Sequence, residues 1–402
     1  MRELQSVTLT VRQRSLDEFG VIRYSVGTIG QYSLATKRGK EAVAMTQQQR
    51  YKTIRRRLLQ WYRQHARDLP WRRTKDPYAI WLSEIMLQQT QVETVIDYYQ
   101  RFLKRLPTVE KMARARQDTI LKLWEGLGYY SRARNAHNAA KQIVSDYDGR
   151  FPQTVEELQT LTGVGRYTAG AIASIAFGQQ APLVDGNVIR VLCRLFRIHG
   201  DPRSDIVQDQ LWEHASELVK TNHPGDFNQA LMELGATVCH RNTPNCDACP
   251  IQSQCKGYRY KEQAVLPERV KPKPRPRHIV VVGVIYRDGL ILIDKRKPRG
   301  LLGGLWEFPG GKKEPGESLP QALKREVKEE LDIQIRVGKK LTTVDHAYTH
   351  FEVQLHVYQC KYLSGTPVCR ECTDFKWVRP VQLTRYAFPT ANKKIFPAIP
   401  GV

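Results

Sequence analysis

Four cysteines lie close together in the middle of the chain, at Cys239, Cys246, Cys249 and Cys255. Four thiolates this close in sequence are typical of a four-coordinate zinc site or of an iron–sulfur cluster. Spacing alone leaves both metals open, although structural zinc usually takes two Cys-x-x-Cys pairs and this stretch has one. A disulfide scaffold is the poorer explanation, because the chain is long and shows no recognisable secretory signal. We therefore expect a metal or cluster site in a reducing compartment.

Two carboxylates stand among apolar residues. Glu84 lies in the segment Trp81-Leu-Ser-Glu-Ile-Met-Leu, and Asp185 follows Pro-Leu-Val. A carboxyl group in apolar surroundings tends to have a raised pKa and suits general-acid catalysis. One protonated and one ionised carboxylate is the arrangement that breaks glycosidic bonds. The alternative is a helix-surface glutamate and an N-cap aspartate, and spacing alone does not relate the two.

A Gly-x-Gly turn, Gly163-Val164-Gly165, precedes a helix-forming run rich in alanine and isoleucine. Glycines let the backbone approach a ligand closely, and N–H groups at a helix start bind anions. The formal net charge of +23 indicates a polyanionic partner, which we expect to be nucleic acid. No apolar run reaches the roughly 18 residues of a membrane span, so we expect no membrane partner. The alternative for the turn is an ordinary packing corner.

Helical periodicity dominates residues 46–260, where apolar side chains recur at three- and four-residue spacing. We predict helices at 78–103, 109–124, 131–147, 154–161, 167–177, 186–198, 205–221 and 226–238. No long strand-like alternation precedes residue 275. These patterns indicate an all-α domain that ends with the cysteine stretch 239–255.

Lys, Arg and Pro alternate in residues 271–277, which predicts that residues 261–277 form an extended, semi-rigid linker. Apolar runs then predict strands at 278–286, 290–294, 336–345, 350–361 and 374–378, with a helix at 318–331. Residues 278–402 therefore form an α/β domain. We interpret its Cys369 and Cys372 as an incidental loop pair.

Residues 1–45 show no sustained periodicity. We assign them no function and expect either disorder or a start codon placed too early, with translation beginning at Met45. A transit peptide is the alternative, although the acidic residues of the segment weaken it.

Residues 46–258 resemble the helix–hairpin–helix DNA glycosylases that carry an iron–sulfur cluster. The cysteine spacing is similar to that family's cluster loop, and 161–165 and 184–187 resemble its hairpin and its catalytic aspartate segment. Residues 81–92 and 126–135 resemble the MutY-type adenine DNA glycosylases in particular. The resemblance implies two α subdomains with DNA in the cleft between them. It also implies a [4Fe–4S] cluster rather than zinc.

The resemblance implies hydrolysis of the N-glycosidic bond of adenine paired with 8-oxoguanine or guanine in duplex DNA, in base excision repair. Glu84 would protonate the flipped adenine at N7, and Asp185 would stabilise positive charge on the sugar. Tyr167 and Asn187 would support this centre. Tyr167 stands where the strand-cutting relatives have a nucleophilic lysine, so we expect a monofunctional enzyme. The residues implied to contact DNA are Arg72, Gln89, Tyr129, Gly163, Gly165 and Gln229.

The C-terminal domain resembles a Nudix domain. Tyr348, Thr349 and His350 stand where the MutY-type family has the loop that senses 8-oxoguanine, which more often reads Phe-Ser-His. An aromatic ring, a hydroxyl and a histidine are all present. The resemblance therefore implies that this loop reads the base opposite adenine.

Residues 311–333 form an almost complete Nudix box, in which Asp332 replaces the late glycine. Glu326, Glu329 and Glu330 fall on one helix face and suit Mg²⁺ bound to substrate phosphates. The alternative, which we favour, is a catalytically silent fold element with a charged helix face.

We expect a monomer that acts on double-stranded DNA in the bacterial cytoplasm. Three other functions stay open: a thymine- or pyrimidine-lesion glycosylase of the same fold, a nucleotide pyrophosphohydrolase with a DNA-binding half, and an architectural DNA binder. The segment around Glu84 and the Nudix-like domain oppose the first. An architectural role leaves the pair Glu84 and Asp185 unexplained.

Overall fold

The computed structural model describes residues 11–16, 22–27, 46–268 and 274–402. Residues 1–46 form one unit and residues 47–402 another. In the first unit, β1 (Val11–Leu16) pairs antiparallel with β2 (Ile22–Gly27). The sequence shows no long strand-like alternation before residue 275, and it did not predict these two strands. Each strand is short, and its hydrogen bonds come from the partner strand, which a local pattern does not reveal.

The remainder of the segment 1–45, including Met45, lies outside the described residues, as do positions 269–273 of the linker. In the parts of the chain that the structure describes, no helix is long and apolar enough to cross a membrane.

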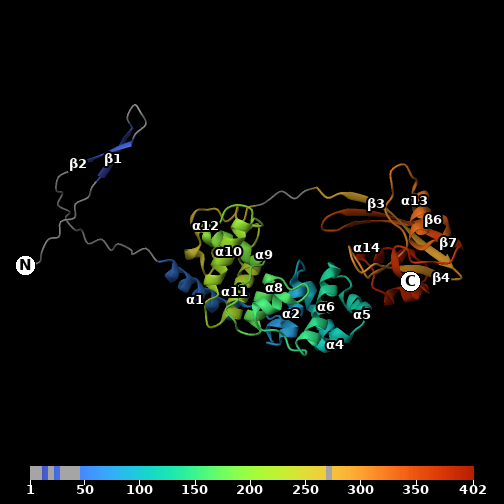
Figure 1. Cartoon of the computed structure of the whole chain (residues 1–402), viewed down its shortest axis with the longest axis horizontal. Coiled ribbons are helices and arrows are strands. Elements are labelled where there is room, and N and C mark those ends of the chain that lie inside the picture. Colours follow the sequence, from blue (N-terminus) through green and yellow to red (C-terminus); the bar gives the residue numbers. More distant parts are fainter. Residues whose placement is uncertain (1–10, 17–21, 28–45, 269–273) are drawn as a thin grey trace, which may run out of the picture. The chain divides into compact units, whose positions relative to one another are not determined.

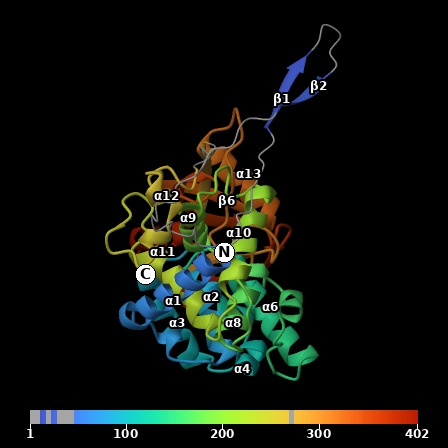
Figure 2. The same ribbon diagram turned by 90° about the vertical axis from the view of Figure 1, so that its left-hand side faces the viewer.

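The helical domain begins with a helix at residue 47 (Figure 1, blue to yellow). Its helices are α1 (Gln47–His65), α2 (Pro77–Leu87), α3 (Val92–Arg105), α4 (Val109–Arg114), α5 (Gln117–Trp124), α6 (Tyr130–Asp146), α7 (Val155–Thr160), α8 (Arg166–Ile175), α9 (Gly186–Phe196), α10 (Asp205–Leu218), α11 (Pro224–Thr237) and α12 (Lys256–Arg259). Helix α1 packs beside α11, from the far end of this domain (Figure 2).

Two of the predicted helices are each divided in the structure. The helix predicted at 78–103 ends at Leu87 and resumes at Val92, and the helix predicted at 109–124 is interrupted after Arg114. At the first break the side chain of Arg132, from α6, binds the carbonyl oxygens of Ile85 and Met86. A tertiary contact thus satisfies the end of α2, which the apolar periodicity cannot indicate.

Two hydrophobic cores hold the helical domain. The first lies among α2 to α8 around Trp81, Phe102 and Trp124. The second joins α1 to α9, α10 and α11 around Leu58 and Phe227. Helices α2 and α8 contribute side chains to both cores and contact each other. They therefore run along the boundary where the two cores meet.

The C-terminal domain is built on a six-stranded sheet, in the order β5-β4-β3-β7-β6 with β8 beside β4. Strands β3 and β7 are parallel, and the other pairs are antiparallel. The strands are β3 (Arg277–Arg287), β4 (Leu290–Arg296), β5 (Trp306–Glu307), β6 (Gln334–Ala347), β7 (Glu352–Ser364) and β8 (Cys372–Val378). The predicted α/β domain is confirmed, and β5 is an addition to the expected strands.

Helical segments cover the two faces of this sheet. Helix α13 (Leu319–Leu331) packs on one face, against Val281 and Leu292. The segment that ends with α14 (Thr390–Lys393) packs on the other, against Val282 and Ile291.

Cys369 and Cys372 form a disulfide at the start of β8. Their interpretation as an incidental pair is wrong. The strand and the preceding loop bring the two sulfurs together. Their separation in the sequence does not by itself indicate whether the two cysteines are bonded.

Candidate active site

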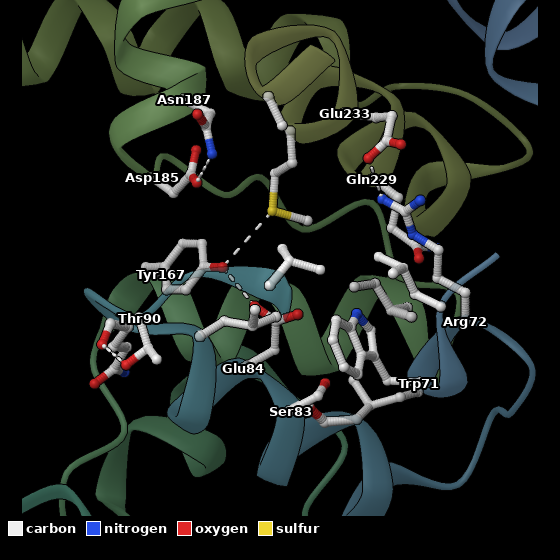
Figure 3. A pocket seen from close by; sticks show the side chains of 18 of the residues that line it. Trp71, Arg72, Ser83, Glu84, Thr90, Tyr167, Asp185, Asn187, Gln229 and Glu233 are labelled. Atoms are coloured by element: carbon white, nitrogen blue, oxygen red, sulfur yellow. Dashed lines mark hydrogen bonds and ion pairs between the residues drawn. The ribbon is translucent and has the colours of Figure 1, made fainter. Parts of the chain in front are cut away.

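A cavity of about 410 Å³ opens at the boundary between the two helical cores. Figure 3 shows most of the side chains that line it, from α2, α8, α9 and α11 and from the segments at Arg72 and Thr90. The lining includes all four predicted catalytic residues and three of those expected to contact DNA: Glu84, Tyr167, Asp185, Asn187, Arg72, Gln89 and Gln229. Residues scattered over much of the helical domain thus meet in one place.

Glu84 is held on the buried helix α2. The helix begins with Asp76, whose side chain accepts a hydrogen bond from the Tyr78 N–H, and with Pro77 in its first turn. Glu84 is only 3% exposed. Burial raises the pKa of its carboxyl group to about 7, against the opposing effect of a hydrogen bond from Tyr167. A large fraction of Glu84 therefore carries a proton near neutral pH, and its carboxyl group lines the cavity.

Asp185 is the N-cap of α9, and both of its oxygens accept hydrogen bonds. The Val188 N–H donates to Oδ1 at 2.7 Å, and the Asn187 amide donates to Oδ2 at 3.1 Å. Arg190 holds that amide by donating to Asn187 Oδ1 at 2.8 Å. Burial raises the pKa of Asp185, and the hydrogen bonds from Val188 and Asn187 oppose this shift. Burial thus raises the pKa of both carboxyl groups, but Asp185 accepts hydrogen bonds from two donors that stabilise its ionised form, whereas Glu84 accepts one, from Tyr167.

Tyr167 connects α8 to α2 and α11. It lies in the first turn of α8, and its hydroxyl donates to Glu84 Oε2 while lying 3.6 Å from the sulfur of Met232 (Figure 3). Met232, on α11, was not predicted. The hydroxyl fixes the orientation of the Glu84 carboxyl group.

The two glycines of the turn before α8 serve different purposes. Gly163 has φ +80°, and a Cβ there would come within 2.7 Å of Asn135. Gly165 has open space where a Cβ would stand, and it is the N-cap of α8. Gly163 is therefore required by the fold, whereas Gly165 leaves the N-terminus of α8 accessible to a ligand.

A buried ion pair forms part of the cavity wall. The Glu233 side chain is fully buried, and it accepts from Arg67 at 2.8 Å and from Arg72 at 2.7 Å. Burial alone would raise the pKa of Glu233, but the hydrogen bonds from Arg67 and Arg72 outweigh it and lower the pKa to about 2. Arg72, expected to contact DNA, thus has its guanidinium engaged by Glu233. The sequence signal for Glu233, a charge on a mostly apolar helix, was the same as for Glu84 and was missed.

Three further residues were predicted to contact DNA, and the structure places one in the cavity and two in exposed turns. Gln229 is buried on α11 and faces the cavity. Gln89 is exposed in the turn between α2 and α3 and has φ +57°. Tyr129 precedes α6, is 37% exposed and has φ +47°. Its hydroxyl is hydrogen-bonded to the Thr349 hydroxyl, so two regions predicted separately touch each other.

The segment 348–350 joins β6 to β7 at the edge of the sheet. The Tyr348 ring stacks on Phe351, with centroids 4.9 Å apart, and meets His346 edge-on. His350 is exposed. Aromatic packing therefore fixes Tyr348, while Thr349 and His350 remain at the surface of this domain.

The acidic residues of the Nudix box are largely paired. Arg325 forms ion pairs with Glu317, Glu326 and Glu329. Glu330 accepts from the Gly310 N–H, and burial raises its pKa to about 8. Within the described ranges, no three acidic, histidine or cysteine side chains meet closely enough to hold a single metal ion.

The four predicted metal-ligating cysteines all line one small cavity with apolar walls beside α9. None of them forms a disulfide. Arg194, which is 2% exposed, donates to Cys239 Sγ at 3.2 Å, and the Tyr258 N–H donates to Cys255 Sγ at 3.4 Å. Four thiols converging in an apolar cavity with N–H donors fit an iron–sulfur cluster. Arg194 was missed because it precedes the cysteines by a long stretch of chain.

Comparisons with known proteins match both domains. A family model described as an HhH-GPD superfamily base excision DNA repair protein matches residues 82–217, and one described as a NUDIX domain matches residues 280–398. The adenine DNA glycosylases of Rattus norvegicus and Homo sapiens are each 39% identical to the chain, over 397 and 400 residues. These matches cover 85% and 86% of the chain, and 77% and 73% of the relatives. That of Schizosaccharomyces pombe is 32% identical and covers 81% of the chain and 84% of the relative.

Proposed function

Because the chain belongs to the family of adenine DNA glycosylases of base excision repair, we propose that its substrate is adenine paired with 8-oxoguanine or guanine in duplex DNA. The observation that carries this proposal is the cavity lined by two carboxyl groups, Glu84 with a pKa raised to about 7 and Asp185 held by hydrogen bonds. A flipped base needs such a pocket, and a glycosidic bond needs such a pair.

Bond cleavage is divided between the two carboxyl groups. Glu84 donates its proton to N7 of the flipped adenine, which makes the base a good leaving group. Asp185 stabilises the positive charge that develops on the sugar, and Asn187 holds its carboxylate. Tyr167 orients Glu84 through its hydrogen bond. Water then completes hydrolysis.

The enzyme removes the base without cutting the strand. A strand-cutting mechanism needs an amine nucleophile that forms a Schiff base with the sugar. Tyr167 occupies the position expected for that lysine, and its hydroxyl is engaged by Glu84. Lys75, a nearby amine, donates to the Ile175 carbonyl oxygen and is not part of the cavity lining.

DNA contacts come from the turns around the cavity. Gln229 contacts the adenine inside the pocket, and Gln89 and Tyr129 enter the duplex beside it. The accessible N-terminus of α8, at Gly165, takes a phosphate. Arg72 contributes to DNA binding indirectly, by holding the pocket wall in place, because its guanidinium is paired with Glu233.

The opposite base is read by Tyr348, Thr349 and His350. The hydrogen bond between Thr349 and Tyr129 supports this assignment, because it brings the reading loop to a residue expected to enter the duplex. The enzyme works as a monomer, since both domains that handle the mispair are on one chain. It acts wherever the genomic DNA lies, which in a bacterium is the cytoplasm.

A [4Fe–4S] cluster is held by Cys239, Cys246, Cys249 and Cys255. The family and the convergence of four thiols in one apolar cavity support it over zinc. Iron and sulfide analysis of the purified protein tests this assignment, with a visible absorption band expected. Zinc at one equivalent without iron would overturn it.

The Nudix box is catalytically silent in this proposal. Arg325 neutralises Glu326 and Glu329, and Glu330 is protonated at neutral pH, so Mg²⁺ would have to displace both an ion pair and a proton. Mg²⁺-dependent hydrolysis of 8-oxo-dGTP that is lost in Glu329→Gln would show that this domain is instead an active pyrophosphohydrolase.

Single-turnover excision on three matched duplexes tests the substrate. We expect adenine to be released faster opposite 8-oxoguanine than opposite guanine, and very slowly opposite thymine. Thr349→Val and His350→Ala should reduce the preference for 8-oxoguanine over guanine, whereas Thr373→Val, on β8 and away from the loop, should not. Equal rates on all three duplexes would contradict the proposal.

A further inference from the structure

Among the non-glycine residues of the helical domain in the left-handed backbone conformation, two stand in turns next to the cavity helices and were predicted to contact DNA. Gln89 has φ +57° between α2 and α3, and Tyr129 has φ +47° between α5 and α6. This conformation is uncommon for residues with a side chain and persists only where the surrounding structure fixes it. The contacts that fix these two turns therefore determine where the Gln89 and Tyr129 side chains stand.

Arg132 closes the first of these turns from α6. It is 8% exposed, and its Nη1 donates to the carbonyl oxygens of Ile85 at 2.8 Å and Met86 at 2.9 Å, and to that of Gln88. These are carbonyls at the end of α2, where a helix leaves its acceptors without intrahelical partners. The Nη2 atom adds a bond to the Thr90 hydroxyl at 3.2 Å. Arg132 thus contacts the residues on both sides of Gln89.

The same guanidinium closes the second turn. Its Nη2 donates to the carbonyl oxygens of Leu127 at 3.2 Å and Gly128 at 3.3 Å, the two residues before Tyr129. The guanidinium carbon also lies 5.5 Å from the centre of the Tyr129 ring. One side chain therefore holds both turns, although Gln89 and Tyr129 belong to different helix junctions.

The chemistry of arginine suits this task. A guanidinium is a rigid, planar fork whose nitrogens can serve acceptors on two sides at once, whereas a lysine ammonium is a single point charge. Burial lowers the pKa of Arg132 to about 10, so the group stays charged at neutral pH. Its hydrogen bonds therefore persist under the conditions in which the enzyme works.

We propose that Arg132 is a positioning residue that couples the Gln89 turn to the Tyr129 turn, so that the two side chains enter the duplex as one rigid unit. The proposal rests on the function proposed above for Gln89 and Tyr129. Arg132 itself touches neither the cavity nor, in this scheme, the DNA. Arg132 determines how strongly the contribution of Gln89 to DNA binding depends on the presence of Tyr129, and the reverse.

A double-mutant cycle tests this coupling. The dissociation constant is measured for a duplex that carries a non-cleavable adenosine analogue opposite 8-oxoguanine, with 2-aminopurine beside it to report base flipping. Gln89→Ala, Tyr129→Ala and the double variant are compared in the wild-type background and in Arg132→Lys. We expect the double variant to depart from the product of the single effects by about threefold or more in the wild-type background. In Arg132→Lys the two effects should multiply independently.

Arg134→Lys is the matched control, because Arg134 lies on the same helix and donates to the Gly303 carbonyl oxygen at 2.7 Å rather than to either turn. It should preserve the coupling. Thr90→Val, which removes the bond of the hydroxyl to Arg132 and its weak bond to the Gln88 carbonyl oxygen but leaves the arginine in place, should weaken the coupling and serves if Arg132→Lys fails to fold. Circular dichroism checks the fold of each variant.

The outcomes distinguish a failure of the proposed coupling from a failure of the proposed DNA contacts. If Gln89→Ala and Tyr129→Ala each weaken binding but multiply independently in the wild-type background, the coupling by Arg132 is refuted and the DNA contacts stand. Coupling that survives unchanged in folded Arg132→Lys and in Thr90→Val also refutes it. If neither single variant affects binding or flipping, the proposed DNA contacts are wrong and the coupling falls with them.

Discussion

Replacing Tyr167 by phenylalanine should move the pH dependence of adenine release to higher pH. The Tyr167 hydroxyl donates to Glu84, and this hydrogen bond lowers the pKa that burial raises. Phenylalanine keeps the ring but removes the donor, so the ionised form of Glu84 loses its stabilisation. In the proposed mechanism the protonated form of Glu84 is the general acid, so activity is present below the Glu84 pKa and is lost as pH rises through it.

The size of the shift follows from the strength of that bond. A hydrogen bond to a charged group is worth about 1.5 kcal/mol, and about 1.4 kcal/mol corresponds to one pKa unit. Losing it should therefore raise the Glu84 pKa from about 7 to about 8. At pH 8 the protonated fraction then rises from about one tenth to about one half, a gain of about fivefold, whereas at pH 6 both proteins are almost fully protonated.

Single-turnover excision from pH 5.5 to 9 measures the midpoint of the basic limb. Tyr78→Phe is the control, because Tyr78 lies on the same helix and its hydroxyl donates to the Leu106 carbonyl oxygen, away from the cavity. Its midpoint should match the wild type. The midpoint is decisive rather than the height of the profile, because Tyr167→Phe can also change how Glu84 is oriented. An unchanged or lowered midpoint would refute the reasoning.

Three further predictions concern the same cavity. Glu84→Gln should abolish adenine release while retaining binding to an A:8-oxoguanine duplex, and turnover near the wild-type rate would contradict the general-acid role. Tyr167→Lys should yield a DNA–protein adduct trapped by borohydride that the wild type lacks, and an adduct from the wild type would show that another amine attacks the sugar. Glu233→Gln should reduce the free energy of unfolding by about 3 kcal/mol at neutral pH, because the Glu233 pKa falls from 4.5 to about 2. That contribution is present above pH 4.5 and is lost as pH falls toward 2, so urea unfolding of the variant and the wild type should converge there.

Much of this protein could be predicted from sequence because its signals are local. Apolar periodicity gave the all-α and α/β domains and most helix positions, since a helix buries one face wherever it packs. The four cysteines were recognised by their spacing, because a loop brings neighbours in sequence together. Glu84 and Asp185 were singled out because a charge among apolar residues must be paired, protonated or functional. Their relation to each other came from the family resemblance.

Other features depended on contacts between distant parts of the chain. The break after α2 is set by Arg132, a side chain on a different helix, so the local pattern continued where the helix did not. Glu233 forms its buried ion pair in the pocket wall with Arg67 and Arg72, which are distant from it in the sequence. The hydrogen bonds of the strand pair β1 and β2 likewise come from a partner strand.

The sequence by itself thus determined which chemical groups are present: two carboxyl groups in apolar segments, four thiols in one loop and an α domain followed by an α/β domain. Only the tertiary structure decided the state of those groups. The pKa of Glu84 reaches about 7 because α2, α8 and α11 together exclude water around it, and Asp185 is surrounded by donors because α9 begins there. Residue types fix which protons can be exchanged, but burial and hydrogen-bond partners fix where those protons reside.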